Sequence, residues 1–510
     1  MAAPWMTIAD IVREHRRSRP NAIALVDGAT RISWSELDRR SSALANRLAA
    51  VGLGQGDRIL WMAQTSCRLF VLLAAAARIG AMVCPINWRQ SAAEMQFVIE
   101  DFSPKVIVWQ AEEIGAAVHE ARALARTQAL WLQLDGEPGE LDAFAAAGED
   151  ADTDREIDPG SPLLVIYTAA FGGRPNGSML THRNLIAMGT YNALLCGVTA
   201  QSVFLNSGPM FHIGNFAFEA IPVLLSGGKN VFVRRVVAQE LLEIVHAERC
   251  TGAFLMPPTI MQMVEANAGR RYDLSCLKAG PNAPLWKGMT TVDSSAWTQL
   301  PGGFGQTEVS GFCVFRGNSP GGIGNAGRPS PFCSVRIVDD AGLELPVGEV
   351  GELVVRGDIV HAGYWNRPEL NAQRLRNGWW HTGDVGMRHE DGTLTFIGTK
   401  ARMIKSAAEN IYPAEVESCI EAHPAVKEAA VIGVPDPRWR QSVRGIVVLR
   451  PGHSATAEEI IEHCRHRIAS YKKPKSVEFV DVLPRLHGLK DYAALDARFG
   501  GGGYPGGENV

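Results

Sequence analysis

The segment from 165 to 185 has a spacing suited to phosphate chemistry but lacks most of the side chains for it. A loop that holds several phosphate groups needs backbone freedom, hydroxyl donors and a positive charge, because several negative charges must be stabilised together. Here Ala170 restricts the backbone, Phe171 brings an aromatic ring, and Asn176 carries no charge. The segment has the residue spacing of a phosphate-binding loop but lacks the side chains that would hold the phosphates. The alternative interpretation is a turn between a strand and a helix that binds no ligand.

A second cluster of useful groups is the run Phe304-Gly305-Gln306-Thr307-Glu308. An aromatic ring offers a flat apolar surface to a base, and a hydroxyl can donate to a phosphate oxygen. A carboxylate is the hard oxygen ligand that magnesium prefers. Taken alone, the run could equally be a turn with an exposed carboxylate.

These segments resemble the adenylate-forming superfamily, which includes acyl-CoA synthetases, peptide-synthetase adenylation domains and firefly luciferases, and the resemblance covers nearly the whole chain. Its loop reads Tyr-Thr-Ser-Gly-Thr-Thr-Gly-x-Pro-Lys-Gly. The matching stretch here keeps the frame and loses a serine, a glycine, two threonines and the lysine. The resemblance therefore implies a degenerate phosphate loop made of Thr168, Ala169, Ala170, Phe171, Gly172, Gly173 and Asn176.

The resemblance also implies a site for an acyl-adenylate. In it, Phe304 stacks on adenine, Thr307 contacts the α-phosphate, Glu308 helps to hold magnesium and Asp384, in Trp-His-Thr-Gly-Asp, accepts the ribose hydroxyls. The other implied acyl-adenylate-binding residues are Asn282, Ala283, Pro284, Gly305, Gln306 and Lys400. His212, in Pro-Met-Phe-His, is expected to gate the acyl channel, and an ordinary structural histidine is the alternative. The implied catalytic residues are His212, Glu308 and Lys490.

The last third of the chain resembles the family's hinge and its coenzyme A tunnel. Arg402 is at the pivot position, where the family has aspartate, and Ala407 and Ala408 replace two glycines before Glu409. Basic and aromatic groups expected near the CoA phosphates are Trp439, Arg440, Lys472 and Lys473. Lys490 is at the position of the adenylation lysine, with leucine instead of glycine before it. A solvated surface lysine is the alternative interpretation of Lys490.

Patterning predicts an α/β fold with more than one domain, because single cores stop growing near about 250–300 residues. Helical spacing at 35–53 and 69–79 alternates with short apolar runs at 58–62, 82–85 and 106–109, which indicate buried parallel strands. Alternating runs after Gly351 predict an antiparallel β-ribbon layer. We expect a large N-terminal acyl/adenylate-binding domain over 1–400, a small mobile α+β domain over 401–499, and a disordered glycine-rich tail over 500–510.

Composition narrows the class of protein. The 510 residues are 46% hydrophobic and 20% charged with a formal net charge of −4, which suits a globular enzyme. No basic run or zinc-type cysteine spacing appears, so we expect no nucleic-acid partner and no metal cluster. No signal-peptide layout or long apolar stretch occurs, and the nine widely spaced cysteines argue against a disulfide framework. These features predict a cytoplasmic protein without a membrane span.

The first hypothesis is a non-adenylating acyl-CoA ligase that transfers the acyl group of a preformed acyl-adenylate to coenzyme A and releases AMP. Its partners would be a bulky hydrophobic carboxylic acid, presented as its adenylate, coenzyme A, and a second ligase that adenylates the acid. The second hypothesis is a complete two-step synthetase using ATP and magnesium. The third is a catalytically silent protein that binds acyl-adenylates or coenzyme A.

Overall fold

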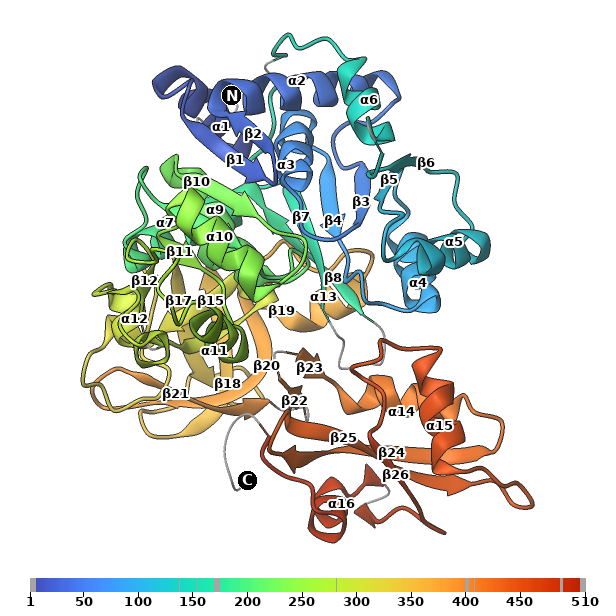
Figure 1. Cartoon of the computed structure of the whole chain (residues 1–510). Helices are drawn as coiled ribbons and strands as arrows, with labels where there is room; N and C mark the ends of the chain where they lie inside the picture. The colour runs from blue at the N-terminus through green and yellow to red at the C-terminus, as the bar shows by residue number, and fades with distance from the viewer. Residues whose placement is uncertain are drawn as a thin grey trace.

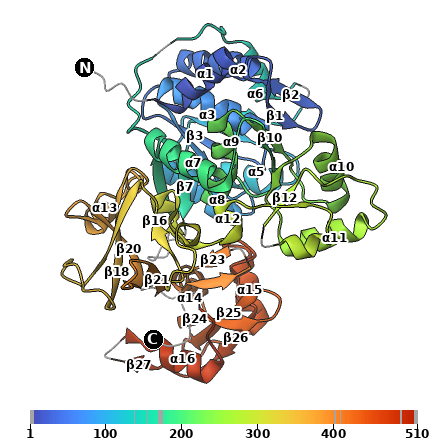
Figure 2. The same ribbon diagram turned by 90° about the vertical axis from the view of Figure 1, so that its left-hand side faces the viewer.

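The computed structural model describes residues 6–136, 138–153, 155–168, 175–280, 282–399, 403–407, 409–486 and 489–504. A large domain carries the N-terminal end of the described chain, and a smaller domain lies beneath it with the C-terminal end (Figures 1 and 2). The predicted Ala169 to Gly173, Lys400, Arg402 and Ala408 lie outside the described residues.

The first sheet of the large domain has six strands in the order β6-β5-β3-β4-β7-β8. Its first five strands run parallel and β8 is antiparallel to β7. The three predicted apolar strands are confirmed with unchanged bounds, because each is buried and reads as a continuous apolar run. The strands are β3 (Arg58–Met62), β4 (Met82–Pro85), β5 (Val106–Trp109), β6 (Leu130–Gln133), β7 (Pro162–Thr168) and β8 (Asn176–Thr181).

Helices cover this sheet and the top of the domain (Figure 1). The alanine-rich helix α3 is almost wholly buried and ends at Gly80, whose φ of 71° is the left-handed conformation that glycine adopts readily. The helices are α1 (Ile8–Ser18), α2 (Trp34–Ala50), α3 (Cys67–Ile79), α4 (Ala92–Phe102), α5 (Gly115–Leu124) and α6 (Glu140–Ala146). The sequence predicts one helix and a surface linker within 110–160, so β6 and α6 are additional elements that it did not predict.

A second sheet, of order β11-β9-β10-β1-β2, is mostly parallel, and its helices pack around it. The loop that follows β9 carries His212, at the start of a helix that passes through one π-helical turn, η1. The strands are β1 (Ile23–Asp27), β2 (Thr30–Ser33), β9 (Val203–Asn206), β10 (Lys229–Phe232) and β11 (Gly252–Ala253). The helices are α7 (His182–Cys196), α8 (Ile213–Asn215), η1 (Phe216–Ala220), α9 (Ile221–Ser226), α10 (Ala238–Glu248) and α11 (Pro257–Ala266).

Short elements and antiparallel ribbons complete the large domain, as the alternating pattern predicted. The strands β17, β18, β20, β19 and β21 form one antiparallel sheet, and β14, β15 and β16 form another. The strands are β12 (Lys278–Ala279), β13 (Thr291–Val292), β14 (Gly303–Gln306), β15 (Gly311–Phe315), β16 (Arg328–Pro329), β17 (Cys333–Val338), β18 (Val350–Gly357), β19 (Leu375–Arg376), β20 (Trp379–Arg388) and β21 (Leu394–Thr399). The helices are η2 (Ala283–Trp286), α12 (Ala296–Gln299), η3 (Thr307–Val309), η4 (Arg316–Asn318) and α13 (Pro368–Arg374).

The small domain has its own sheet, in the order β23-β22-β25-β24 with β26 beside β25. It also has its own apolar core, in which Val416, Ile420 and Val431 are fully buried. Its elements are β22 (Ile404–Ser406), β23 (Glu409–Ile411), α14 (Pro413–Glu421), β24 (Val426–Asp436), β25 (Arg440–Leu449), α15 (Ala457–Arg465), β26 (Ser476–Phe479), β27 (Arg485–Leu486), β28 (Leu489–Lys490) and α16 (Tyr492–Phe499).

The expectation of a disordered tail is wrong for residues 500–504. Gly502 N donates to Gly433 O at 2.9 Å, and Gly433 N donates to the Tyr504 hydroxyl at the same distance. The Tyr504 ring packs against the small-domain core. Composition alone could not reveal these contacts, because a single aromatic ring, that of Tyr504, fixes a glycine-rich segment to the domain. The remaining residues, 505–510, lie outside the described part.

Among the described residues, every helix is too short or too polar to cross a lipid bilayer. The predicted cytoplasmic location stays a prediction.

Candidate functional site at the junction of the two domains

The ends of the predicted phosphate loop are anchored by pairing of β7 with β8, in which Thr168 lies opposite Asn176. Asn176 is 8% exposed, and its amide oxygen accepts a hydrogen bond from Arg367 Nε at 3.0 Å. Arg367 Nη1 also donates to Asp101 at 2.8 Å, and the Tyr167 hydroxyl donates to the same carboxylate at 2.6 Å. The residue at the lysine position is thus a neutral amide tied to an arginine that is already paired with an acid.

Two buried carboxylates form the acidic centre of the site. Glu308, in η3, is 8% exposed and accepts a 2.7 Å hydrogen bond from the Tyr364 hydroxyl, while Thr168 Oγ1 lies 3.4 Å from the same oxygen. Asp384, in β20, is 7% exposed and accepts from Gln306 Nε2 at 2.9 Å. These contacts bring Thr168, Gln306, Glu308 and Asp384 together, and their predicted roles stay predictions.

Burial sets the charge of this centre. Desolvation raises the pKa of Asp384 to about 7, and the neighbouring Glu308 carboxylate raises it further than burial alone would. Burial likewise raises the pKa of Glu308, while the hydrogen bond from Tyr364 lowers it. The Arg374 guanidinium lowers the pKa of both acids. Burial therefore disfavours the ionised form of both acids, whereas a ligand that donates hydrogen bonds or carries positive charge would favour it.

Phe304 differs from its predicted role as an open stacking surface. The residue is 3% exposed, and its ring stacks on Phe396 with centroids 5.3 Å apart. The partner lies on a strand far along the chain, so sequence reasoning could not find it. The neighbouring Gly305 is exposed and Thr307 is half-buried at the start of η3.

The predicted residues Asn282, Ala283 and Pro284 form the start of the short helix η2, with Asn282 as its N-cap. Ala283 packs against the core below the second sheet, and Pro284 is exposed. Their predicted contact with an acyl-adenylate stays a prediction.

His212 lies where the small domain meets the large one. Its ring is open to solvent, and Nδ1 accepts from Gly214 N at 3.2 Å. Surrounding protein atoms and the cationic Lys405 of β22 lower the pKa of His212, whereas Glu409 of β23 raises it. At neutral pH its imidazole is uncharged and can accept a proton.

Sequence reasoning missed several residues at this junction. Lys405 was visible within the hinge motif but received no role, and Arg89 had no signal at all. Arg89 forms an ion pair with Glu409 and lies 5.6 Å from the ring centre of Phe211. Tyr412, the N-cap of α14, is close enough to Glu308 and Asp384 for these acids to raise its pKa, after the larger effect of burial.

Lys490 is not at the acidic centre. Its ammonium donates to Glu417 at 2.9 Å, to Ala429 O at 2.6 Å and to Glu421 at 3.4 Å, all within the small domain. The adjoining β27 lies at the end of that domain remote from the large one (Figure 2). The predicted catalytic lysine is therefore held away from the substrate site in this orientation.

The predicted CoA-binding residues divide into two groups. Ala407, Trp439 and Arg440 are exposed on the small domain, and Lys473 is half-buried beside it. Lys472 contradicts the prediction, because it is 4% exposed and forms ion pairs with Glu94 and Glu415. Its ammonium is not free to meet a phosphate in this orientation.

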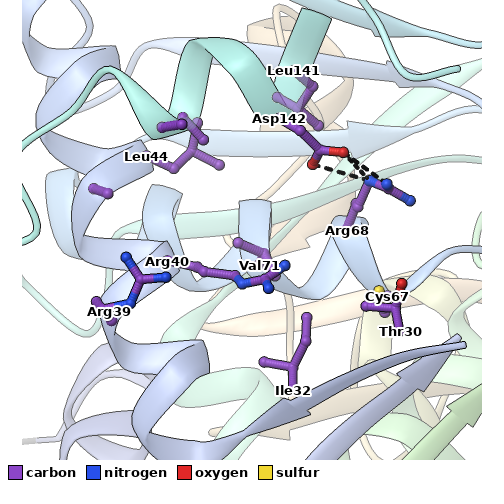
Figure 3. Close-up of a pocket in the computed structure, with 13 residues that line it drawn as sticks. Thr30, Ile32, Arg39, Arg40, Leu44, Cys67, Arg68, Val71, Leu141 and Asp142 are labelled. Atoms are coloured by element: carbon purple, nitrogen blue, oxygen red, sulfur yellow. Dashed lines mark hydrogen bonds and ion pairs between the residues drawn. The ribbon is translucent and has the colours of Figure 1, made fainter. Parts of the chain in front are cut away.

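A separate cavity of about 330 Å³ lies between α2, α3, α6 and β2, away from the residues described above (Figure 3). Its walls are mainly apolar, with arginines at the rim. Arg68 already pairs with Asp142, and Arg39 and Arg40 pair with Glu36. With its cations neutralised, this cavity has no evident part in the chemistry.

The raised pKa of Asp384 predicts a pH-dependent loss of stability. In the unfolded chain this carboxyl ionises near its ordinary pKa of 3.8, and in the folded protein near about 7. Between those values the folded state binds more protons, so the free energy of unfolding falls as pH rises. We expect Asp384→Asn to reduce this fall, as measured by urea unfolding at pH 5 and pH 8. An unchanged difference between the two pH values would contradict the assignment.

Comparisons with known proteins agree with this arrangement. The family model described as AMP-binding enzyme matches residues 12–365, and that of the AMP-binding enzyme C-terminal domain matches 415–487. A feruloyl-CoA synthase from Amycolatopsis sp is 36% identical over 93% of this chain and 94% of that protein. An indoleacetate–CoA ligase from Aromatoleum aromaticum is 30% identical over 94% and 95%.

Solved structures give the same result. The o-succinylbenzoate CoA synthetase double mutant from Bacillus subtilis, bound with its product analogue OSB-NCoA, has a TM-score of 0.75 and 26% identity over 94% of this chain and 96% of that one. A Mycobacterium tuberculosis fatty acyl CoA synthetase has a TM-score of 0.68 and 26% identity over 97% and 98%. The chain belongs to the AMP-binding enzymes, in the acyl-CoA ligase family of the adenylate-forming superfamily.

Proposed function

We propose that this ligase performs the thioester-forming half-reaction, in which the acyl group of a preformed acyl-adenylate passes to coenzyme A and AMP is released. Adenylation of the free acid is impaired or lost. The observation that carries this proposal is the neutral Asn176 at the lysine position, tied to an arginine that Asp101 already neutralises. A triphosphate bound at this loop would lack the cation that it needs.

The energetic argument rests on what else the loop has lost. Ala169, Ala170, Phe171 and Gly172 supply no hydroxyl donor. A charge-assisted hydrogen bond is worth about 1.5–3 kcal/mol, so losing several of them weakens triphosphate binding by orders of magnitude. Lys490 does not compensate while it is paired with Glu417 in the small domain.

The orientation of the small domain suits the thioester step. The hairpin of β22 and β23 brings Lys405 and Glu409 beside the ring of His212. In the proposed step the CoA thiol sulfur attacks the carbonyl carbon of the mixed anhydride, the bond from carbon to phosphate oxygen breaks, and AMP leaves. The thiol proton passes to Nδ1 of the uncharged His212 imidazole, which gives up its hydrogen bond from Gly214 N. Holding thiol and carbonyl together supplies much of the rate, since AMP is already a good leaving group.

The acyl group we propose is bulky, hydrophobic and aromatic. Phe218, Trp297 and Phe312 are half-buried rings in mutual contact, with centroids 4.6–5.5 Å apart. Phe218 lies on η1, which begins shortly after His212, and Phe312 lies on β15, which begins shortly after Glu308. Both rings are therefore on elements that start next to the site. The named substrates of two relatives, feruloyl and indoleacetate, are likewise aromatic.

Coenzyme A would meet the exposed face of the small domain. Arg438 lies over the Trp439 ring at 4.6 Å, and Arg440 is exposed next to it. Guanidinium groups suit the phosphates at the nucleotide end of CoA. Lys473, beside Lys475 and Arg465, adds positive charge. A partner ligase that adenylates the acid would supply the substrate.

One assay tests this proposal against a complete synthetase. We expect synthetic feruloyl- or indoleacetyl-adenylate with CoA to give thioester. The matching free acid with ATP, magnesium and CoA should give it at least about 100-fold more slowly, because even one or two lost charge-assisted hydrogen bonds cost that much. The measurement is thioester yield by chromatography.

Comparable rates from the free acid, with pyrophosphate release, would favour the second hypothesis, in which Glu308 would hold the magnesium of ATP. If calorimetry detected binding of acyl-adenylate and CoA but no thioester formed, the third hypothesis of a silent binding protein would stand.

A single reversion at the loop should not restore adenylation. Asn176→Lys places an ammonium beside the Arg367 guanidinium, which is paired with Asp101. The hydroxyl donors stay absent as well. We expect no ATP–pyrophosphate exchange and a lower unfolding temperature, whereas the uncharged control Asn176→Gln should lower that temperature less. Exchange restored by Asn176→Lys alone would show that the missing charge was the whole defect.

A further inference from the structure

A buried cation lies at the interface between the domains. Lys472 follows α15 and is 4% exposed. Its ammonium donates to Glu415 of the small domain at 2.6 Å and to Glu94 of the large domain at 2.9 Å. Glu94 sits in the first turn of α4, where its other oxygen accepts from Ser91 N. One lysine therefore joins two helices from different domains.

Further contacts surround this cation, and their large-domain partners all fall within residues 87–94. Ser91 Oγ donates to Arg467 O at 3.0 Å, and Asn87 Nδ2 donates to the Tyr471 hydroxyl at 3.2 Å. Arg89 pairs with Glu409 and lies 5.5 Å from the ring centre of Tyr471. Residues 87–94, which precede α4 and form its first turn, thus contact three parts of the small domain. These contacts lie on the side where α4 faces α14 and α15 (Figure 1).

Burial makes the orientation of the small domain sensitive to these charges. Side chains of Lys472 and Glu94 are 6% and 10% exposed, so separating them would leave a carboxylate without its partner in a partly dry interface. Two acids share one ammonium, and Glu415 retains an oxygen with no hydrogen bond. Rotating the domain would keep Lys472 with Glu415 but break the pair with Glu94.

We propose that residues 87–94 and Lys472 form an interdomain latch. The latch comprises Asn87, Arg89, Ser91 and Glu94 on the large domain and Glu409, Glu415, Arg467, Tyr471 and Lys472 on the small one. These are positioning residues that hold the β22–β23 hairpin beside His212 throughout turnover.

The latch rests on the proposed function. An enzyme that receives a ready-made adenylate has no step in which Lys490 must reach the acidic centre. Keeping the small domain in one orientation then prevents no step of the reaction. In this orientation Lys490 keeps its ion pairs with Glu417 and Glu421.

A charge exchange tests the latch. Glu94→Lys sets two ammonium groups against each other, and Lys472→Glu sets three carboxylates together. With synthetic acyl-adenylate as substrate, we expect each variant to lower kcat/KM for CoA by about tenfold or more, mainly through KM, because the hairpin is no longer held. The KM for acyl-adenylate should change little. The double variant should recover to within about threefold of the unmodified enzyme, since the opposite charges again face each other.

Glu100→Lys is the matched control. Glu100 is exposed on the same helix and accepts from Gln96 and Arg126 N of its own domain. This variant should keep the KM for CoA. Glu94→Lys also disturbs the cap of α4, but the double variant retains that disturbance, so recovery in it isolates the ion pair. Small-angle X-ray scattering should detect a broader range of domain orientations in the two single variants only.

Single variants with unchanged KM for CoA and unchanged scattering would overturn the latch, as would a loss that the double variant does not recover. Should Lys472→Glu fail to fold, Glu94→Gln gives the same decision, because its amide oxygen can still accept from Ser91 N while the charge that faces Lys472 is removed. Failure of the proposed function is seen separately, as rapid ATP-dependent activity of the unmodified enzyme.

Discussion

A neutral amide where a triphosphate needs a cation is the constraint on which the functional interpretation depends. Asn176 is not merely a missing lysine, because its amide oxygen belongs to a hydrogen-bond network with Arg367, Asp101 and Tyr167 that joins β7, β8 and α4 to the segment before α13. The network is partly buried, and the charge of Arg367 is balanced by that of Asp101. Under the proposed function, the network stabilises a fold that keeps the family's loop spacing without a lysine at position 176.

Three strands of the first sheet, β3, β4 and β5, were predictable, because each is a short continuous apolar run that is buried in the structure. The acidic centre was predictable by resemblance, because Glu308 and Asp384 sit in short local motifs. What escaped prediction is contact between distant residues. The stacking of Phe304 on Phe396 and the pairing of Lys472 with Glu94 leave no local pattern. For this reason the burial of Lys472 was not predicted, because a lysine is expected to be exposed to solvent when its acidic partners are unknown.

The site is shared between two domains, and this explains how one fold can separate two reactions. Glu308, Asp384 and His212 come from the large domain, while Lys405, Glu409 and Tyr412 come from the small one. Lys490, which the resemblance places at the position of the adenylation lysine, lies on the far side of the same small domain. Only one set of small-domain groups can face the acids at a time, so the orientation of that domain selects the chemistry.

The backbone conformation of Ala407 fits the same interpretation. Its φ is 52°, a left-handed conformation that costs a residue with a Cβ about 1–2 kcal/mol, where the family has glycine. A glycine there would suit a hinge loop that must adopt two shapes. An alanine held at this angle by the hydrogen bond from its N–H to Trp439 O suits a loop that keeps one. Under the proposed function, the losses at the phosphate loop and at the hinge are two consequences of a single change, the loss of the first half-reaction.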